Sequence, residues 1–191
     1  IIGSFCMGSC DDMTDAPVYS ENEVIAPEAG TAEIYVLNEG LFNLNNSTLM
    51  RYSFSNGTQT PDYFKKINKR GLGDTANDMA IYGSKLYVVV NVSSQIEVID
   101  LKTGTSLKQI GMLTENGSSR QPRYITFFEN KAYVCSFDGT VARIDTTSLA
   151  IEALTQVGRN PDGLCVQNNK LYVSNSGGLD NPNYDNTVSV I

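Results

Sequence analysis

Short apolar runs separated by Gly, Asn, Asp and Pro follow one another from residue 32 to residue 191. No window shows the apolar spacing of an amphipathic helix, so the pattern predicts an all-β chain. One run recurs at 82–88, 128–134 and 167–173, where a turn is followed by Lys, a small or apolar residue, Tyr and Val. A weaker copy lies at 31–36. Such repetition predicts an array of small sheets that bury their apolar residues against one another.

Each repeat can be divided into four strands. In the second full copy, around 128–134, we expect an inner strand at 123–128, a second at 132–135, a third at 141–145 and an outer strand around 151–157. Asp145 ends the third strand, where an Asp side chain can cap the backbone of the following turn. Asp100 ends the third strand of the preceding copy in the same way.

The length of the repeat indicates the architecture. The tyrosines of the four copies, at positions 35, 87, 133 and 172, lie 52, 46 and 39 residues apart. Four-stranded units of about 40–50 residues are typical of propeller blades, and propellers close with about 4–8 blades. Residues 32–191 are therefore predicted to form a partial β-propeller of about three and a half blades, half of a seven-bladed ring.

Composition narrows the classes of function. The 191-residue chain has a formal net charge of −7, which argues against a nucleic-acid partner. It contains no His, which excludes Ser-His and Cys-His nucleophile pairs and His-ligated metals from this segment. No catalytic residue, metal site or cofactor is predicted, and we expect a binding protein rather than an enzyme.

The cysteines form two pairs with different predicted roles. Residues 1–10 are mostly apolar or small and are followed by acidic residues, as at the end of a secretory signal. The segment ending at Cys10 resembles a bacterial lipobox, with Met7 where Leu is usual, which predicts lipidation of Cys10. The alternative is a plain N-terminal tail with incidental cysteines. Residues 11–31 are acidic and contain two prolines, which predicts a flexible tether.

The other two cysteines lie in strand-like runs. Cys135 and Cys165 are predicted to be buried small hydrophobic residues.

Several segments resemble the Tyr-Val-Thr-Asn repeat of YncE-like β-propellers. The segment 157–163 is similar to that family's glycine-to-proline connection between blades, and 187–191 is similar to its third strand. The tetrapeptides that carry the resemblance are Tyr35-Val36-Leu37-Asn38, Tyr133-Val134-Cys135-Ser136 and Tyr172-Val173-Ser174-Asn175. The resemblance covers residues 32–191 and implies the propeller fold.

A narrower resemblance concerns function. The segment 175–186, together with the lipobox, resembles surface-exposed propeller lipoproteins of gut Bacteroidetes. Some of these capture cobalamin and pass it to a TonB-dependent transporter. The resemblance implies a protein held at the outer-membrane cell surface by a lipid anchor, with a small-molecule nutrient as ligand and the transporter as partner.

The lengths of the connections predict which face binds a ligand. Connections from second to third strands share one face with those between blades. They are short at 91–94 and 136–139 but long at 38–47 and 175–186. Long connections in compact domains are commonly functional, so the ligand is expected on this face.

The candidate ligand-binding residues on this face offer amide, guanidinium, carboxylate and aromatic groups, which suit a large ligand with a polar edge. Three of them, Asn77, Arg123 and Asp162, occupy equivalent positions in three blades and are expected to face a central channel. The alternative is that these are ordinary turn residues. The full set is Asn38, Phe42, Asn77, Asp78, Arg123, Tyr124, Asn160, Asp162, Asn175 and Tyr184.

Three functions remain open from the sequence. The first is a surface lipoprotein that captures a nutrient, with cobalamin as the leading ligand. The second is an interaction module for protein or glycan partners. The third is a propeller lyase or lactonase, whose catalytic groups would have to come from outside this segment because it has no His.

Overall fold

The computed structural model describes residues 33–178 and 180–191, all of which belong to one compact unit. The predicted lipidation of Cys10 and the predicted tether at 11–31 lie outside the described residues. Within this part of the chain, no helix is long and apolar enough to cross a membrane.

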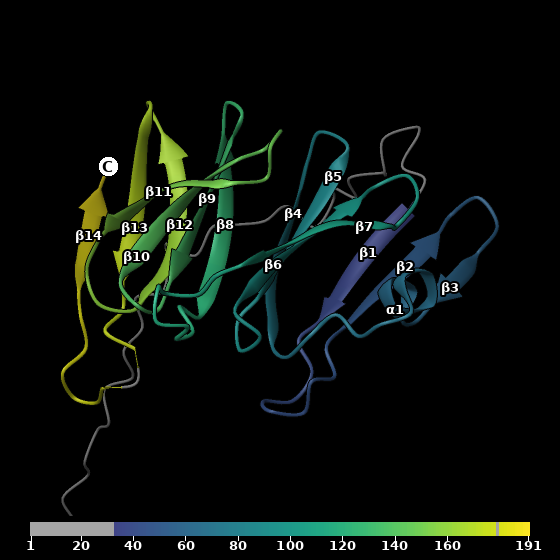
Figure 1. The fold of residues 1–191 in the computed structure, drawn as a ribbon, viewed down its shortest axis with the longest axis horizontal. Helices are drawn as coiled ribbons and strands as arrows, with labels where there is room; N and C mark the ends of the chain where they lie inside the picture. Colours follow the sequence, from purple (N-terminus) through teal and green to yellow (C-terminus); the bar gives the residue numbers. More distant parts are fainter. Residues whose placement is uncertain (1–32, 179) are drawn as a thin grey trace, which may run out of the picture. The chain divides into compact units, whose positions relative to one another are not determined.

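The unit is built from four antiparallel sheets that follow one another in chain order (Figure 1). The first sheet contains β1 (Glu33–Asn38), β2 (Thr48–Ser53) and β3 (Thr58–Thr60). The second contains β4 (Ala76–Tyr82), β5 (Lys85–Val90), β6 (Gln95–Asp100) and β7 (Ser106–Gly111). The third contains β8 (Pro122–Phe128), β9 (Lys131–Ser136), β10 (Thr140–Asp145) and β11 (Ile151–Gln156). The fourth contains β12 (Pro161–Gln167), β13 (Lys170–Asn175) and β14 (Thr187–Val190).

This architecture confirms the predicted partial β-propeller and the four-strand division of the repeat. The repeated tyrosines Tyr87, Tyr133 and Tyr172 lie on the second strands β5, β9 and β13, and Tyr35 lies on β1. Strand β1 is therefore the counterpart of a second strand. Among the described residues, the first sheet accordingly has second, third and fourth strands, and the last sheet has first, second and third strands.

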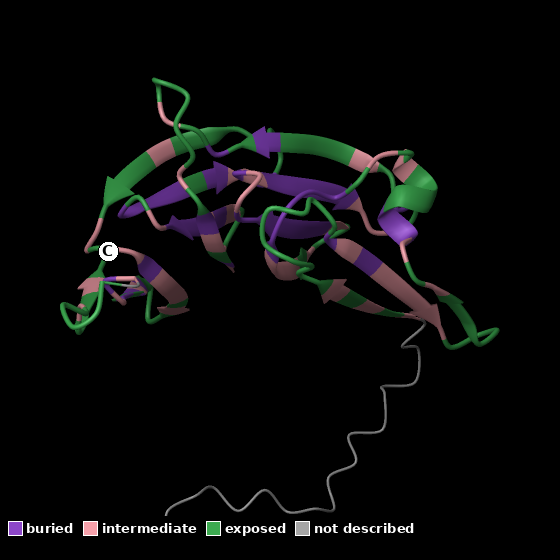
Figure 2. Ribbon diagram, turned by 90° about the horizontal axis from the view of Figure 1, so that it is seen from below, coloured by how far each residue is buried: buried purple, intermediate pink, exposed green. Residues whose placement is uncertain are grey.

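The core lies between successive sheets. Strand β5 is buried from Leu86 to Val90, and its side chains alternate between two clusters. Leu86 and Val88 pack toward Leu49 of the first sheet, whereas Tyr87 packs toward Val134 of the third. Because β5 is covered on both faces, it has a continuous apolar sequence rather than an alternating one. The outer strands β7 and β11 are mostly exposed, and Figure 2 distinguishes buried from exposed stretches.

The aspartates at the ends of the third strands cap the following turns, as the sequence predicted. The Asp100 carboxylate accepts hydrogen bonds from the backbone N–H and the hydroxyl of Thr103, each at 2.8 Å. The Asp145 carboxylate accepts from the N–H groups of Thr147 at 3.0 Å and Ser148 at 2.7 Å. Both predicted Asp caps are confirmed, and each fixes the turn between a third and a fourth strand.

One element was not predicted. A helix of six residues, α1 (Tyr63–Asn68), lies in the connection between the first and second sheets. Asp62 caps its N-terminus by accepting from the Lys65 N–H at 3.1 Å. Six residues are too few to show a helical apolar period, and tertiary packing of the buried Tyr63 and Phe64 stabilises the helix instead.

The two described cysteines differ from each other. The prediction of a buried residue is confirmed for Cys135 and is wrong for Cys165, which is exposed. Cys135 packs between the third and fourth sheets beside Val173. Cys165 lies on the last sheet, where none of the described residues adds a further sheet, so a strand position did not ensure its burial.

Candidate binding site

The structure places the long connections on one face, as the sequence predicted. Between second and third strands, the connections at 39–47 and 176–186 are long, whereas those at 91–94 and 137–139 are short. The connections between sheets start from the same ends of the sheets. We call this side the loop-rich face.

The first strands of three sheets carry a β-bulge where they reach the loop-rich face. In β4 the pairing passes from Ala76 opposite Val90 to Asp78 opposite Val89, so Asn77 is the additional residue. In β8 Arg123 is additional in the same way, and β12 shifts between Pro161 and Leu164. A bulge re-aims a side chain out of the alternation of its strand. The three bulges therefore turn equivalent positions away from the ordinary pleat.

Among the bulged residues, Arg123 contacts both Asn77 and Asp162, and we call the three the bulge triad. The Nε of Arg123 donates to Oδ1 of Asp162 at 2.9 Å, and its Nη1 donates to Oδ1 of Asn77. The amide of Asn77 donates back to the Arg123 carbonyl at 2.8 Å. Arg123, on the third sheet, therefore connects the second and fourth sheets, and the three positions that are equivalent in the sequence lie together in the structure.

Aromatic rings flank the guanidinium of the triad. The Cζ atom of Arg123 lies 4.7 Å from the centroid of the Phe137 ring and 5.7 Å from that of Tyr124. Tyr124 is 36% exposed. Cation–π attraction to both rings restrains the guanidinium. The result is a rigid surface that offers hydrogen bonds and flat apolar area together.

Asp78 has a supporting position beside the triad. Its Oδ2 accepts from the backbone N–H of Ile125 at 2.9 Å, and its Oδ1 accepts from that of Met79 at 2.9 Å. Burial raises the pKa of this carboxyl, while the two hydrogen bonds act in the opposite direction. Asp78 thus ties β4 to β8 and fixes the spacing between the sheets that Arg123 bridges.

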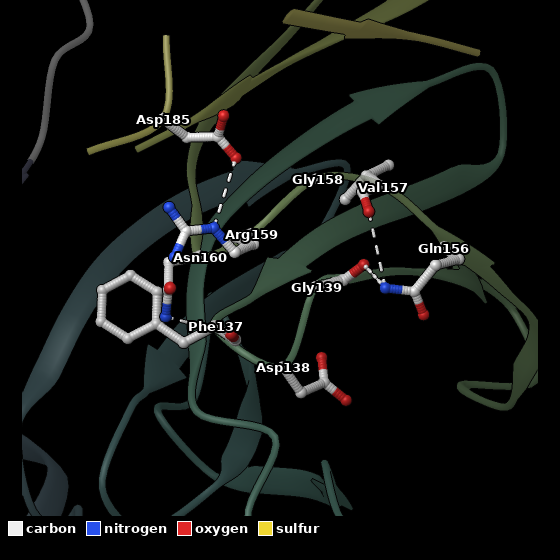
Figure 3. A pocket seen from close by; sticks show the side chains of 9 residues that line it. All are labelled: Phe137, Asp138, Gly139, Gln156, Val157, Gly158, Arg159, Asn160 and Asp185. Atoms are coloured by element: carbon white, nitrogen blue, oxygen red, sulfur yellow. Dashed lines mark hydrogen bonds and ion pairs between the residues drawn. The ribbon is translucent and has the colours of Figure 1, made fainter. Parts of the chain in front are cut away.

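A hollow of about 290 Å³ lies beside Phe137 and is lined by residues of the third sheet, of the connection that follows it and of the loop before β14 (Figure 3). Arg159 extends across it toward Asp185, with 3.8 Å between Nε and Oδ2. The side-chain amide of Asn160 donates to the Phe137 carbonyl at 3.2 Å. Phe137 therefore connects this hollow, which we call the Arg159 pocket, with the bulge triad.

The predicted residues of the first sheet lie apart from the triad. Asn38 ends β1 and donates to the Thr48 hydroxyl at 3.0 Å. Phe42 is 71% exposed at the tip of the following loop. The Asp74 carboxylate holds this loop in place by accepting from the N–H groups of Asn43 at 3.1 Å and Asn45 at 2.9 Å. Asn38 and Phe42 thus border the face without joining the polar contacts at its centre.

The predicted residues of the last sheet have contrasting environments. Asn175 is buried: its amide donates to the hydroxyls of Thr187 and Ser189, both at 3.0 Å, and its oxygen accepts from the Gly158 N–H at 3.1 Å. All these contacts are internal, so Asn175 shapes the loop that follows it. Tyr184 in that loop is 58% exposed and available for contact.

Two residues of this face were missed in the sequence. Phe137 follows β9 in a short turn, and Arg159 precedes β12 next to a residue that was predicted. A signal existed for Arg159, since it lies in the same connection as Asn160. The contact of Phe137 with Arg123 depends on the distance between two segments of the third sheet, which the sequence does not display.

The side chains of this face are of types that can make both polar and stacking contacts. The face combines one fixed guanidinium, amides and carboxylates with the rings of Tyr124 and Phe137, a set that binds polar edges and flat surfaces. Among residues 33–178 and 180–191, no group of three or more His, Cys, Asp or Glu side chains could hold a metal ion.

The fold and this face define a partial β-propeller, with two four-stranded and two three-stranded sheets among the described residues and with the long loops on one side. The chain belongs to the DUF5074 family, described as a domain of unknown function, whose model matches residues 32–187. The search of curated proteins gives no match.

Solved structures resemble the fold at low sequence identity. The computationally designed Ika8 protein has a TM-score of 0.58 at 12% identity over 83% of this chain and 42% of that chain. U3-55K has a TM-score of 0.58 at 15% identity over 83% and 45%. BamB from Moraxella catarrhalis has a TM-score of 0.51 at 13% identity over 75% and 38%. The chain spans less than half the length of each of these three, and identities this low show the fold alone.

Proposed function

We propose that this protein is a binding protein whose loop-rich face captures a small-molecule nutrient and that it does not act as an enzyme. The observation that carries the proposal is the bulge triad. Asn77 and Asp162, from two neighbouring sheets, hold the bulged Arg123, and its guanidinium lies near two aromatic rings. A guanidinium fixed in this way is suited to recognising acceptor groups on a ligand.

The geometry favours a large, flat ligand with a polar edge. Tyr124 and Phe137 supply area for stacking, while the triad and the Arg159 pocket supply donors and acceptors on either side of Phe137. A corrinoid has this character, with a flat ring bordered by amides. Cobalamin is accordingly the first ligand to test.

The proposal includes a location and a partner. Lipidation of Cys10 would hold the protein at the outer-membrane cell surface, and a TonB-dependent transporter would receive the captured ligand. Both suggestions are supported by the lipobox-like sequence ending at Cys10 and by the segment at 175–186.

Calorimetry on the full-length protein with cyanocobalamin tests the ligand. We expect saturable binding that Arg123→Ala and Tyr124→Ala each weaken by at least about fivefold, since a hydrogen-bonding or stacking contact is worth about 1–3 kcal/mol. Arg143→Ala is the matched control, because Arg143 is an exposed arginine of β10 whose Nε donates to Glu152 at 3.2 Å, outside the described site. Absence of binding heat at micromolar protein would exclude cobalamin as the ligand. An equal loss of affinity in Arg143→Ala would contradict the placement of the binding site at Arg123 and Tyr124.

A second candidate is an interaction module for glycan or protein partners. Exposed apolar side chains at the loop tips favour it, since Leu41 is 64%, Phe42 71% and Tyr184 58% exposed. Replacing Phe42 with Ala separates the two candidates. It would weaken docking of a large partner while leaving the affinity for cobalamin within about twofold, because a rim contact contributes little to binding a ligand seated elsewhere.

A further inference from the structure

A second polar hollow, of about 310 Å³, lies away from the loop-rich face. It is enclosed by the hairpin of β2 and β3, by α1, and by the turn between β6 and β7. These turns join third to fourth strands, so they belong to the face opposite the one that carries the bulge triad.

The register of the β2–β3 hairpin builds one wall. Arg51 pairs directly with Thr60, and Ser53 pairs directly with Thr58. Side chains two residues apart on a strand lie on one face. The guanidinium and three hydroxyl groups therefore form a compact patch on the side of the hairpin that lines the hollow.

The helix and the neighbouring sheet complete the enclosure. Tyr63, Lys66 and Ile67 line the hollow from α1, and their spacing of three and four residues places them on one side of the helix. Lys102 and Thr103 line it from the turn after β6. Two sheets and a helix thus bring an arginine and two lysines to one place.

The charge of this hollow is unusual for the chain. Three of the residues that line it are cationic, and none of these lining residues is Asp or Glu, although the whole chain has a net charge of −7. Glu33 pairs with Arg51 from outside the lining, and Asp100 accepts from Thr103. Three cations against two bordering carboxylates leave a positive site, which attracts anions.

Arg51 supplies the guanidinium of the hollow. Its Nε is buried and has no hydrogen-bond partner within residues 33–178 and 180–191. Its guanidinium is fixed by Glu33 and lies 5.0 Å from the centroid of the Tyr63 ring. The Nε is closed off from solvent, but the Arg51 side chain as a whole is 31% exposed. An oxyanion in the hollow would therefore meet the exposed part of the guanidinium and the two lysines.

We propose that this hollow binds a phosphate or sulfate group carried by a small ligand. The arginine and lysines would hold the oxyanion, while Thr58 and Thr60 would supply hydroxyl donors. Tyr63 and Ile67 form an apolar side that can take the carbon skeleton. The volume is near the lower end of small-molecule sites, which begin at about 300 Å³, so the group carried is no larger than a single sugar ring.

The test titrates the full-length protein with inorganic phosphate, inorganic sulfate, glucose 6-phosphate and neutral glucose at constant ionic strength. Backbone amide NMR shifts of Thr60 and Thr103 report occupancy, and calorimetry gives the affinity. We expect saturable binding of the anions and none of glucose. A preference for phosphate over sulfate, or the reverse, identifies the kind of ester.

Variants decide whether the hollow is the site. Lys66→Ala and Lys102→Ala should each weaken anion binding about tenfold, because each removes a charge-assisted contact. Lys108→Ala is the matched control, since Lys108 is an exposed lysine on β7 outside the hollow. If one variant does not fold, the other still decides. No saturation by either inorganic anion, or an equal effect of Lys108→Ala, would overturn the proposal.

Discussion

Replacing Arg123 with Met should destabilise the protein, because Arg123 connects three sheets. The variant keeps an unbranched apolar stem in place but removes the contacts with Asp162 and Asn77 and the attraction to two rings. Met therefore isolates the contribution of the guanidinium from that of packing.

The magnitude follows from the contacts. A hydrogen bond between charged groups contributes about 1.5–3 kcal/mol. The lower end applies here, because the side chains of Arg123 and Asp162 are 19% and 31% exposed and solvent screens the pair. A partly exposed cation–π contact adds about 0.5–1 kcal/mol. We expect a loss of about 2–3 kcal/mol in the free energy of unfolding, which for a domain of this size lowers Tm by about 4–12 °C.

Urea denaturation of four proteins measures the effect and its origin. The wild type, Arg123→Met, Asp162→Ala and the double variant form a cycle, for which contacting residues give a coupling energy of about 0.5–3 kcal/mol. Arg143→Met is the control and should change stability by less than about 0.5 kcal/mol, because it alters an exposed ion pair. A coupling energy indistinguishable from zero would refute the view that Arg123 acts through Asp162.

Two further predictions concern buried groups. Tyr87→Phe should leave stability at neutral pH unchanged or slightly higher, because the buried Tyr87 hydroxyl has no hydrogen-bond partner among the described residues. Burial raises the pKa of Tyr87 to about 12 from its ordinary 10.0. The wild type should therefore lose stability as the pH rises from 10 toward 12, and Tyr87→Phe should lose less. Urea denaturation of both proteins across this pH range measures the difference, and parallel curves of stability against pH would contradict the assignment. In a variant with Cys6 and Cys10 replaced by Ser, Cys165 should react quickly with a thiol reagent and Cys135 only on unfolding, because burial raises the pKa of the Cys135 thiol. Equal rates for both thiols would show that Cys135 is accessible.

The propeller architecture, apart from the short helix α1, could be predicted from the sequence because the repeats can be aligned with one another. Because the same sequence motif recurs, each strand can be located by comparison with its counterparts in the other repeats. The capping residues Asp100 and Asp145 mark where third strands end. Burial was less predictable. Cys165 has the sequence context of a core strand, but its exposure depends on the sheet beside it, which is not a local property.

The candidate site was predictable only in part. Equivalent positions in the repeat identified Asn77, Arg123 and Asp162 as a set. Their contacts depend on how closely the sheets pack and on which bulge turns which side chain, and no single segment contains that information. The contact between Phe137 and Arg123 was missed for the same reason.

The bulge triad has a consequence for how the protein would respond to its ligand. A ligand bound at Arg123 would contact the interfaces between blades rather than a single blade, so its binding would stabilise the packing of neighbouring blades. Binding that favours the assembled state raises resistance to unfolding in proportion to the logarithm of ligand concentration. Ligand binding would also be sensitive to packing elsewhere in the protein, because displacement of one blade would separate the three side chains of the bulge triad and disrupt the binding site.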